Sequence, residues 1–341
     1  MDCVGRHIDT GVNMNKDRFL ITGALGCLGA WAVKRLIDEQ TEVFTYDLPG
    51  DPHRMRLIMT DDAIKNVNFI QADITDFDAF DHAVSTNKIT HIVHLAALQV
   101  PFVRANPVQG TRVNMVGQAV VLESSKRNSA HVIGLSYASS AAVYGSTDLY
   151  GSAPLPHDAK HAPGNLYGVF KDANEGQARI YWEEHRLPSV GLRPYVVYGP
   201  GRDQGMTSTP TKAMLAVAAG KPYEISYGGT VVFHHADDVA SIFIRAARAA
   251  MTGAHVYNLG GNTAHMDDVI TAINLAVPEM AGRVTFKPGS VNLPEAIDDS
   301  ALNAALGVTS YRPLNRGVAE TVETFREAIR NGRIDVNRAL A

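Results

Sequence analysis

The chain has 341 residues, 45% of them hydrophobic and 19% charged, an ordinary globular composition with enough apolar side chains for a large core. A formal net charge of −4 gives no electrostatic footprint for nucleic acid, and no apolar run is long enough to span a bilayer. The two cysteines, Cys3 and Cys27, indicate neither a metal site nor a disulfide framework, so we expect a cytoplasmic protein without a metal.

The first residues of the chain are polar and lack the apolar middle of a secretory signal. We interpret residues 1–17 as a flexible extension because they are polar and charged, and Met14 could also begin the protein. An ordered arm at a subunit interface is the alternative.

Short apolar runs alternate with amphipathic stretches through the first half of the chain. Strands are expected at residues 18–22, 42–46, 67–70, 89–94, 131–137 and 189–193, and helices at residues 26–38, 77–85, 108–127 and 166–185. Strands separated by helices form right-handed βαβ units, so the pattern predicts an α/β fold with a parallel sheet covered on both faces.

The pattern changes after about Gly199, where glycine and proline become frequent and short elements mix. Helices are expected at residues 211–219 and 237–250, and strands at residues 231–235 and 256–259. We therefore assign residues 18–200 to one sheet domain. Residues 201–341 are expected to form mainly a smaller C-terminal lobe of the same compact unit.

A glycine-rich turn, residues 22–29, directly follows the first strand and opens the first helix. Its three glycines permit a tight turn, close approach of the backbone to a pyrophosphate and close packing of helix on strand, and the helix N-terminus attracts phosphate. This strand–turn–helix context predicts a Rossmann-type doubly wound sheet that binds NAD over residues 18–200, and leaves substrate binding to the C-terminal lobe. The residues of the turn that we expect at the cofactor are Gly23, Gly26, Cys27, Leu28 and Gly29.

Asp47 closes the second strand, about 20 residues beyond the glycines, where an acid can accept hydrogen bonds from a ribose 2′-hydroxyl. A carboxylate there repels the 2′-phosphate of NADP, and no Arg or Lys follows before Arg54, so NAD is favoured. The alternative is that Asp47 only caps a turn before Pro49.

Further motifs follow in an order that one known family shares. The matching segments are Gly23–Gly29, Asp73-Ile74, His94–Ala97, Asn114–Gly117, Ser139–Gly145, Tyr167–Lys171 and Leu192–Arg202. Together they resemble the extended short-chain dehydrogenase/reductases, the group that includes the NAD-dependent sugar epimerases and dehydratases. The resemblance covers roughly residues 18–250.

The resemblance implies roles for further residues. The pair Asp73 and Ile74 is expected to hold the adenine ring, and the run Leu95, Ala96 and Ala97 to flank the nicotinamide ribose. Lys171 is expected to bind the same ribose. Asn114 would orient the site through helix backbone or water contacts, or else be a structural polar residue of its helix.

Tyr167 and Lys171 are four residues apart on a predicted helix and therefore share one face. A tyrosine is a poor base at its unperturbed pKa of about 10. The Lys171 ammonium and the positive nicotinamide ring both favour the phenolate, so Tyr167 can take a proton from a carbinol while hydride leaves for the nicotinamide. Ser140, in the catalytic register of the family, would hydrogen-bond the substrate oxygen. Ser139 is the neighbouring alternative, which we expect to support the backbone.

Two departures from the family pattern narrow the substrate. An Asp-Glu pair that drives water elimination in the dehydratases is replaced by the pair Ala141-Ala142, so dehydration is not expected. An arginine that commonly grips the diphosphate of a nucleotide sugar is missing, because the pair Val231-Val232 occupies its place. Arg202 or Arg193 could substitute for that grip, since a guanidinium fork suits phosphate or carboxylate.

Other polar residues are candidates for the substrate pocket. Gln99 and Arg104 follow the fourth strand at the sheet edge where open α/β sheets bind ligands, although a role in a solvated loop is the alternative for each. His234 and His235 are adjacent on a strand and point to opposite faces, so at most one faces the pocket. We take His235 as that candidate, with a structural role as the alternative, and expect His94 to pack at the sheet edge.

We expect an NAD-dependent dehydrogenase that oxidises a secondary alcohol of a sugar, sugar acid or polyol, with Tyr167 as general base. An NAD-dependent nucleotide-sugar epimerase, in which the transient ketone stays bound, is the alternative. A dinucleotide-binding regulator without turnover is the third hypothesis, although it would need neither Ser140 nor the pair Tyr167 and Lys171. The expected partner is a small carbohydrate-like molecule rather than nucleic acid or a membrane. The resemblance also implies a homodimer formed through the helices at 108–127 and 166–185.

Overall fold

The computed structural model describes residues 17–151, 154–307 and 309–340. The extension expected at residues 1–17 lies outside these ranges except for Asp17, and Cys3 lies outside them too. Within the described ranges, no helix combines the length and the apolar character that crossing a bilayer requires.

A seven-stranded parallel sheet forms the centre of this α/β fold, as the alternation of strands and helices predicts. Its strands are β1 (Arg18–Thr22), β2 (Glu42–Asp47), β3 (Asn68–Gln71), β4 (His91–His94), β5 (Gly134–Ala138), β6 (Ser189–Arg193) and β10 (Ala254–Asn258). Their spatial order is β10-β6-β5-β4-β1-β2-β3, and every neighbouring pair runs parallel. Because the chain winds outward from β1 on both sides, the gap between β1 and β4 is the topological switch point at which such sheets bind ligands.

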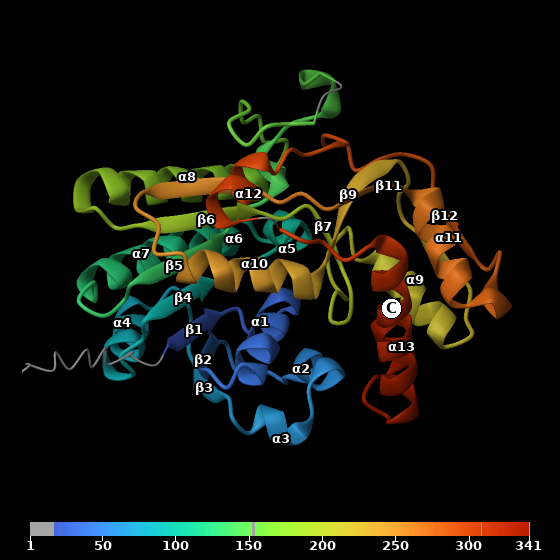
Figure 1. The fold of residues 1–341 in the computed structure, drawn as a ribbon, viewed down its shortest axis with the longest axis horizontal. Helices are drawn as coiled ribbons and strands as arrows, with labels where there is room; N and C mark the ends of the chain where they lie inside the picture. Colours follow the sequence, from blue (N-terminus) through green and yellow to red (C-terminus); the bar gives the residue numbers. More distant parts are fainter. Residues whose placement is uncertain (1–16, 152–153, 308, 341) are drawn as a thin grey trace, which may run out of the picture.

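Helices cover both faces of the sheet, because alternate residues of each buried strand point to opposite sides. Phe19 and Ile21 of β1 pack in one core with α1 (Cys27–Asp38), α10 (Ala236–Arg248) and α12 (Ser300–Leu306). Leu20 packs in a second core with α4 (Phe77–Thr86) and α7 (Gly117–Arg127). Helix α8 (Leu166–His185) contacts α7 (Figure 1). The doubly wound sheet predicted from the sequence is therefore confirmed.

The predicted helix at 108–127 is interrupted in the structure. Its path runs through α6 (Pro107–Thr111), a π-helical turn η1 (Arg112–Val116) and then α7. The remaining short elements of this half are α2 (His53–Ile58), α3 (Asp61–Ile64), α5 (Val100–Ala105) and the 3₁₀ turns η2 (Ala141–Val143) and η3 (Thr147–Leu149).

The smaller lobe is built on two small sheets with a core of their own. Strand β9 (Thr230–His235) lies between β7 (Val196–Tyr198), which is parallel to it, and β11 (Asn262–His265), which is antiparallel. The second sheet pairs β8 (Tyr223–Ile225) with β12 (Val284–Phe286). The helical elements of the lobe are α9 (Thr209–Ala218), α11 (Met266–Ala276), η4 (Pro278–Met280), α13 (Leu314–Arg330) and α14 (Val336–Leu340).

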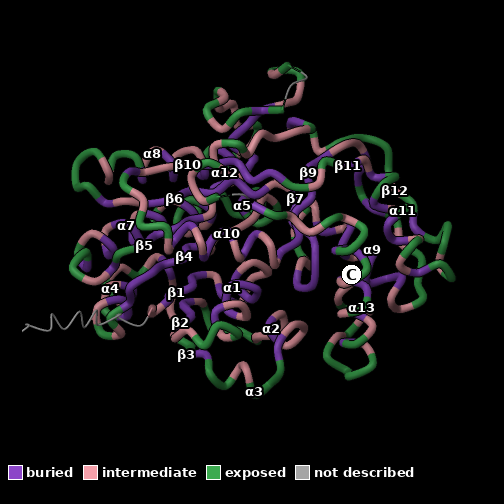
Figure 2. The backbone as a smooth tube through the Cα atoms, in the orientation of Figure 1, coloured by how far each residue is buried: buried purple, intermediate pink, exposed green. Residues whose placement is uncertain are grey.

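The lobe is not one continuous stretch of sequence, because α10 and β10 return to the large sheet between β9 and β11. Figure 2 shows the buried backbone along the central strands and around β7 and β9, whereas the outer turns near α3 are exposed. The chain therefore passes between the two lobes more than once, and the cavity described below is lined by residues from both.

Candidate active site

A cavity of about 980 Å³ opens at the carboxyl ends of the parallel strands, beside the switch point. The segments that follow β1, β2, β3, β4 and β5 all contribute to its lining. From the other side the cavity is lined by residues 194–197, residues 201–204 and, in the C-terminal lobe, residues 291–293. This is the place where open α/β sheets bind ligands.

The glycine-rich turn forms one wall of this cavity. Gly23 has a φ of 65°, and a Cβ on it would lie only 2.7 Å from the backbone nitrogen of Ala96. A Cβ on Gly29 would collide with the carbonyl oxygen of Gly23 and lie 2.6 Å from the Cα of Ala24. No side chain caps the first turn of α1, so its first N–H groups stay available to a ligand. The turn therefore fits the pyrophosphate of a dinucleotide.

Cys27 and Leu28 begin α1 and also line the cavity. Burial raises the pKa of the Cys27 thiol to about 12, so the thiol stays neutral and acts as a small packing group.

Asp47 lines the cavity and also caps the turn behind the glycines, so both sequence interpretations have a structural counterpart. Its carboxylate accepts hydrogen bonds from the backbone nitrogens of Leu25 and Leu48, each at 2.8 Å. Burial raises the pKa of this carboxyl, while the two N–H groups and the nearby Arg54 oppose the rise. A ribose hydroxyl bound to Asp47 stays a prediction.

Arg54, the first Arg or Lys after Asp47 in the sequence, also lines the cavity. Its guanidinium donates to the carbonyl of Leu25 at 2.8 Å and forms a multiple ion pair with Asp203, with an Nη2–Oδ1 distance of 2.8 Å. Since Asp203 neutralises this cation, Arg54 does not offer an unpaired charge to a 2′-phosphate. The ion pair links α2 to the loop after β7.

The residues expected at the adenine and the nicotinamide ribose also reach the cavity wall. The predicted residues in these stretches that line it are Asp73, Ile74, Leu95, Ala96 and Ala97. Thr22 fixes the last of these segments, because its hydroxyl accepts from the backbone nitrogens of Leu95 and Ala96 and also bonds to His94 at 2.7 Å.

Asn114 is not brought to the cavity wall, so the expected cofactor contact is corrected to a supporting one. Its buried amide lies in the π-helical turn and makes two hydrogen bonds to the backbone of Leu98, at 2.8 and 3.0 Å. The side chain thus fixes the segment after β4 that does line the cavity.

Ser140, Tyr167 and Lys171 all line the cavity, and their catalytic role stays a prediction. Tyr167 lies in the first turn of α8, and the Ser140 side chain lowers the pKa of its phenol. The Ser140 Oγ accepts from the backbone nitrogen of Ala142 at 3.1 Å. The buried Lys171 ammonium lies 5.6 Å from the centre of the Tyr167 ring and donates to the carbonyl of Ala138 at 2.6 Å. A phenol, a hydroxyl and an ammonium therefore face one volume.

Gly168 explains how α8 comes so close to the turn that carries Ser140. A Cβ at Gly168 would collide with the carbonyl oxygen of Ala142 and lie 2.9 Å from Pro163. The helix begins next to this contact, where the side chain of Asn165 accepts from the Gly168 nitrogen at 3.0 Å. Any larger residue at position 168 would move Tyr167 away from Ser140.

The electrostatics of the phenol differ from the sequence expectation. Burial raises the pKa of Tyr167, while the Ser140 hydrogen bond and the positive charge of Arg202 lower it. Burial also lowers the pKa of Lys171 to about 8, with Glu175 opposing that shift. In the ligand-free chain Lys171 therefore loses its proton before the phenol does, and Arg202 is the permanent cation that favours the phenolate.

A buried ion pair between Glu175 and Arg193 lies next to Lys171 on α8. Glu175, one turn beyond Lys171 on α8, receives two hydrogen bonds from Arg193, at 2.8 and 2.7 Å, and one from the Ser139 hydroxyl. Arg193 also donates to the Tyr144 hydroxyl at 2.6 Å. Ser139 therefore bonds to the Glu175 side chain rather than to the backbone that we expected it to support, and Arg193 is committed to Glu175 rather than to a substrate.

The substrate candidates separate into two groups. Gln99 and Arg202 both line the cavity, and the Arg202 Nη1 donates to the Gln99 Oε1 at 3.2 Å. Arg104 is exposed on α5 and lies outside the cavity wall, so that candidate is corrected to a surface residue.

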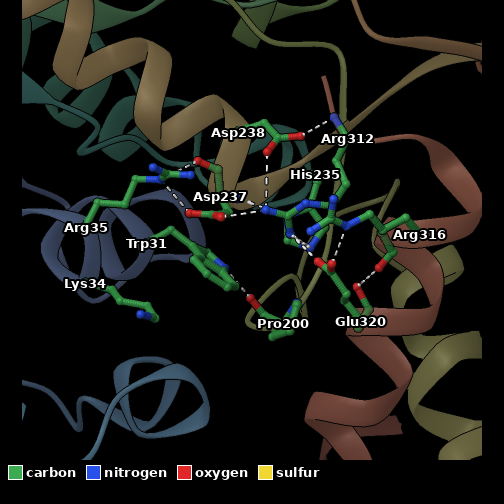
Figure 3. Close-up of polar contacts among 12 residues, drawn as sticks. Trp31, Lys34, Arg35, Pro200, His235, Asp237, Asp238, Arg312, Arg316 and Glu320 are labelled. Carbon is green, nitrogen blue, oxygen red and sulfur yellow. Dashed lines mark hydrogen bonds and ion pairs between the residues drawn. The ribbon is translucent and has the colours of Figure 1, made fainter. Parts of the chain in front are cut away.

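His235 also lies outside the cavity wall, in a cluster that joins α1, the start of α10 and the segment before α13 (Figure 3). The Arg312 guanidinium contacts the His235 Nδ1 at 3.0 Å and donates to Asp237 at 2.7 Å, and Arg35 donates to the same carboxylate at 2.6 Å. Burial, aided by the charge of Arg312, lowers the pKa of His235 to about 3, so the ring is neutral. The structural role is therefore the one observed, and a cation already occupies the nearby acidic group.

The structure agrees with what the sequence indicated for the two departures from the family pattern, the missing arginine on β9 and the missing Asp-Glu pair after Ser140. Val231 and Val232 are 0% and 1% exposed in the middle strand of the three-stranded sheet, so neither contacts a ligand. Ala141 and Ala142 line the cavity beside Ser140 and add neither an acid nor a base there.

Comparison with known proteins relates this arrangement to others. The model of the NAD dependent epimerase/dehydratase family matches residues 19–260. The UDP-glucose 4-epimerase of Mycolicibacterium smegmatis is 28% identical, over 91% of this chain and 98% of that protein. The human dTDP-D-glucose 4,6-dehydratase is 25% identical, over 95% and 93%. The crystal structure of Thermus thermophilus UDP-glucose 4-epimerase with NAD superposes with a TM-score of 0.75 at 24% identity, over 91% of this chain and 99% of that one.

Proposed function

The chain belongs to the NAD-dependent epimerase/dehydratase family, and from that premise we propose that it is an NAD-dependent dehydrogenase of a secondary alcohol on a sugar, sugar acid or polyol. The observation that carries the proposal is that Ser140 and Tyr167 line the same cavity as the glycine-rich turn, where the serine lowers the pKa of the phenol. The buried Lys171 beside the phenol supports the same assignment.

Bound NAD would supply a hydride acceptor, and every other step falls to the residues of the chain. We assign the glycine-rich turn to the pyrophosphate, Asp47 to the adenosine ribose and Lys171 to the nicotinamide ribose. The Tyr167 phenolate takes the hydroxyl proton of the substrate while the hydrogen on the same carbon leaves as hydride. The Ser140 hydroxyl donates to the substrate oxygen and holds it as the carbonyl forms. The alcohol thereby loses one proton and one hydride and becomes a ketone or lactone.

The lining of the cavity favours release of an oxidised product over the two reactions named among the relatives. Dehydration needs an acid and a base beside the hydroxyl, and Ala141 and Ala142 supply neither. A nucleotide-sugar epimerase must hold a diphosphate firmly while the ketone turns over, and the buried Val231 and Val232 leave no cation on β9 for it.

Nucleotide-sugar epimerisation is the second candidate, because a UDP-glucose 4-epimerase aligns with 91% of the chain. The two activities differ in their demand for cofactor. A dehydrogenase incubated with NAD and a panel of polyols, aldonates and uronates should accumulate NADH. An epimerase should instead convert a UDP-, GDP- or dTDP-sugar without added NAD. Absence of NADH with every class of alcohol would refute the dehydrogenase.

We also propose that two copies associate through α8 and the helical segment before α7. Val116, Val169 and Ile180 on these elements are 44%, 44% and 36% exposed, which is unusual for apolar side chains of helices that cover a sheet. Light scattering of the purified protein should give twice the mass of the chain, and a monomer would contradict the association.

A further inference from the structure

Apart from its effect on the pKa of Tyr167, Arg202 has no role in the proposed mechanism. It lies on the loop between β7 and α9 and lines the cavity. Its charge lowers the pKa of the Tyr167 phenol and also that of the Cys27 thiol, so the guanidinium acts on both the reacting group and the start of α1.

The guanidinium has neutral partners only. Nη1 donates to the Gln99 amide oxygen at 3.2 Å and Nη2 to the Thr207 hydroxyl at 3.0 Å, whereas the buried Nε has no partner. The neighbouring Asp203 is occupied by Arg54 and His53, and no other described carboxylate forms an ion pair with Arg202. A partly buried cation without a counter-ion in the chain is stabilised when an anion enters the cavity.

Three contacts fix the loop that carries Arg202, so the guanidinium has a fixed position. Figure 3 shows the Trp31 indole pointing to Pro200, whose carbonyl oxygen accepts from Nε1 at 3.0 Å. The nitrogen of Gly199 donates to the Thr211 hydroxyl at 3.2 Å, and Asp203 is paired with Arg54. A fixed donor group binds an anion with little loss of side-chain entropy.

The remaining cations at the cavity wall are committed elsewhere. Lys171 donates to the Ala138 carbonyl, and Arg54 is neutralised by Asp203. One uncompensated positive charge suits a group with one negative charge, such as a carboxylate, better than the two charges of a diphosphate. The Tyr195 hydroxyl, buried without a partner in a residue that lines the same cavity, offers a further donor.

We propose that Arg202 binds a carboxylate of the substrate, so that the alcohol oxidised by this chain is that of a sugar acid or a related hydroxy acid. The proposal rests on the proposed dehydrogenase function and narrows its substrate class. Gln99 and Thr207 position the guanidinium, and the carboxylate takes the Nε edge. The alternative anion at Arg202 is the diphosphate of the cofactor, and the test below distinguishes it from a substrate carboxylate.

The test compares aldonates with the corresponding alditols in wild type, Arg202→Gln and Arg202→Lys. Wild type should prefer aldonates. Because Arg202 also lowers the pKa of Tyr167, Arg202→Gln slows both substrates by a common factor, and the readout is the ratio of their kcat/KM values. That ratio should fall about 100-fold, the loss expected for charge-assisted hydrogen bonds, and Arg202→Lys should restore part of it. Arg104→Gln, an exposed residue outside the cavity, is the matched control and should leave the ratio unchanged.

Calorimetry provides a readout that does not depend on turnover. NADH-loaded wild type should bind an aldonate but not its alditol, and Arg202→Gln should lose that binding while its affinity for NAD stays the same. A loss of NAD affinity with an unchanged aldonate preference would assign Arg202 to the cofactor and overturn the proposal, as would equal turnover of both substrate classes. Arg202-dependent aldonate binding without any NADH formation would support the carboxylate site and refute the dehydrogenase.

Discussion

Replacement of Ser140 by alanine tests whether its hydroxyl lowers the pKa of the Tyr167 phenol, on which the proposed chemistry depends. The Ser140 Oγ accepts from the Ala142 nitrogen at 3.1 Å, which occupies one lone pair and leaves the hydroxyl proton free to point at Tyr167. When the phenol ionises before substrate binds, that proton stabilises the phenolate, and it is donated to the substrate oxygen once the substrate is in place. The alanine variant loses this interaction and keeps the fold, since the hydroxyl has no other structural partner than the Ala142 nitrogen among the described residues.

The size of the effect follows from the charge on the acceptor. A hydrogen bond to an ionised group contributes about 1.5–3 kcal/mol, and a pKa unit corresponds to about 1.36 kcal/mol. Ser140→Ala should therefore raise the pKa of Tyr167 by roughly one to two units, which moves the rising limb of the pH–rate profile to higher pH. At neutral pH the value of kcat/KM should fall roughly 10- to 100-fold, and part of this loss should be recovered at alkaline pH.

The assay is NADH formation measured from neutral to alkaline pH, with NAD affinity determined separately. Ser140→Thr retains a hydroxyl and should restore part of the activity at neutral pH. Ser85→Ala removes an exposed hydroxyl on α4, away from the cavity, and should change nothing. A uniform loss at every pH, with no shift of the rising limb, would refute the claim that Ser140 acts on the phenol.

Three further results are expected. Asp47→Asn should weaken NAD binding about 10-fold or more in a calorimetric titration, because the carboxylate accepts charge-assisted hydrogen bonds; unchanged NAD affinity would leave Asp47 as a turn cap only. Arg312→Ala should lower the free energy of unfolding in urea by about 1.5–3 kcal/mol, since Asp237 and Glu320 lose their shared cation but keep Arg35 and Arg316; an unchanged midpoint would contradict that role. The ion pairs with Arg35 and Arg312 lower the pKa of Asp237, so their stabilisation is present above about pH 4 and is lost as the pH falls through the folded-state value. The same acid sensitivity in wild type and Arg312→Ala would count against this linkage.

The elements that the sequence located well are those set by local patterns. Helix α8 and strand β6 have the bounds predicted for them, because a long amphipathic stretch and a short apolar run lie on either side of a clear break at Arg186 to Pro188. The other strands of the large sheet in the first half begin or end within a few residues of the prediction. Apolar residues that recur every 2 residues indicated the strands, and those that recur every 3.6 residues indicated the helices.

The interrupted helix shows what periodicity omits. A π-helical turn adds one residue to a single turn and leaves the apolar pattern of 108–127 almost unchanged, so no local signal separated η1 from its neighbours. The two strands of the small β8–β12 sheet are three residues long and 58 residues of chain separate them, so each is stabilised by a partner that local reasoning cannot see.

Some residues of the candidate site could likewise be predicted from local sequence patterns, whereas others depend on contacts between distant parts of the chain. The motif placed Ser140, Tyr167 and Lys171 together because two of them are one helical turn apart and the third ends a neighbouring strand. Glu175 carried a usable signal, since it lies four residues after Lys171 on the same helix face. Three side-chain pairings join distant parts of the chain and could be found only in the structure. They are Arg193 with Glu175, Arg54 with Asp203, and Arg312 with His235.

Transfer of the substrate proton to the Tyr167 phenolate is the central claim, and Tyr167→Phe tests it most directly. Phenylalanine keeps the ring beside Lys171 and removes only the oxygen. NAD should bind this variant with the wild-type dissociation constant, while kcat for NADH formation should fall about 100- to 10,000-fold, the usual contribution of a general base. Turnover within a few-fold of wild type would show that another group takes the proton.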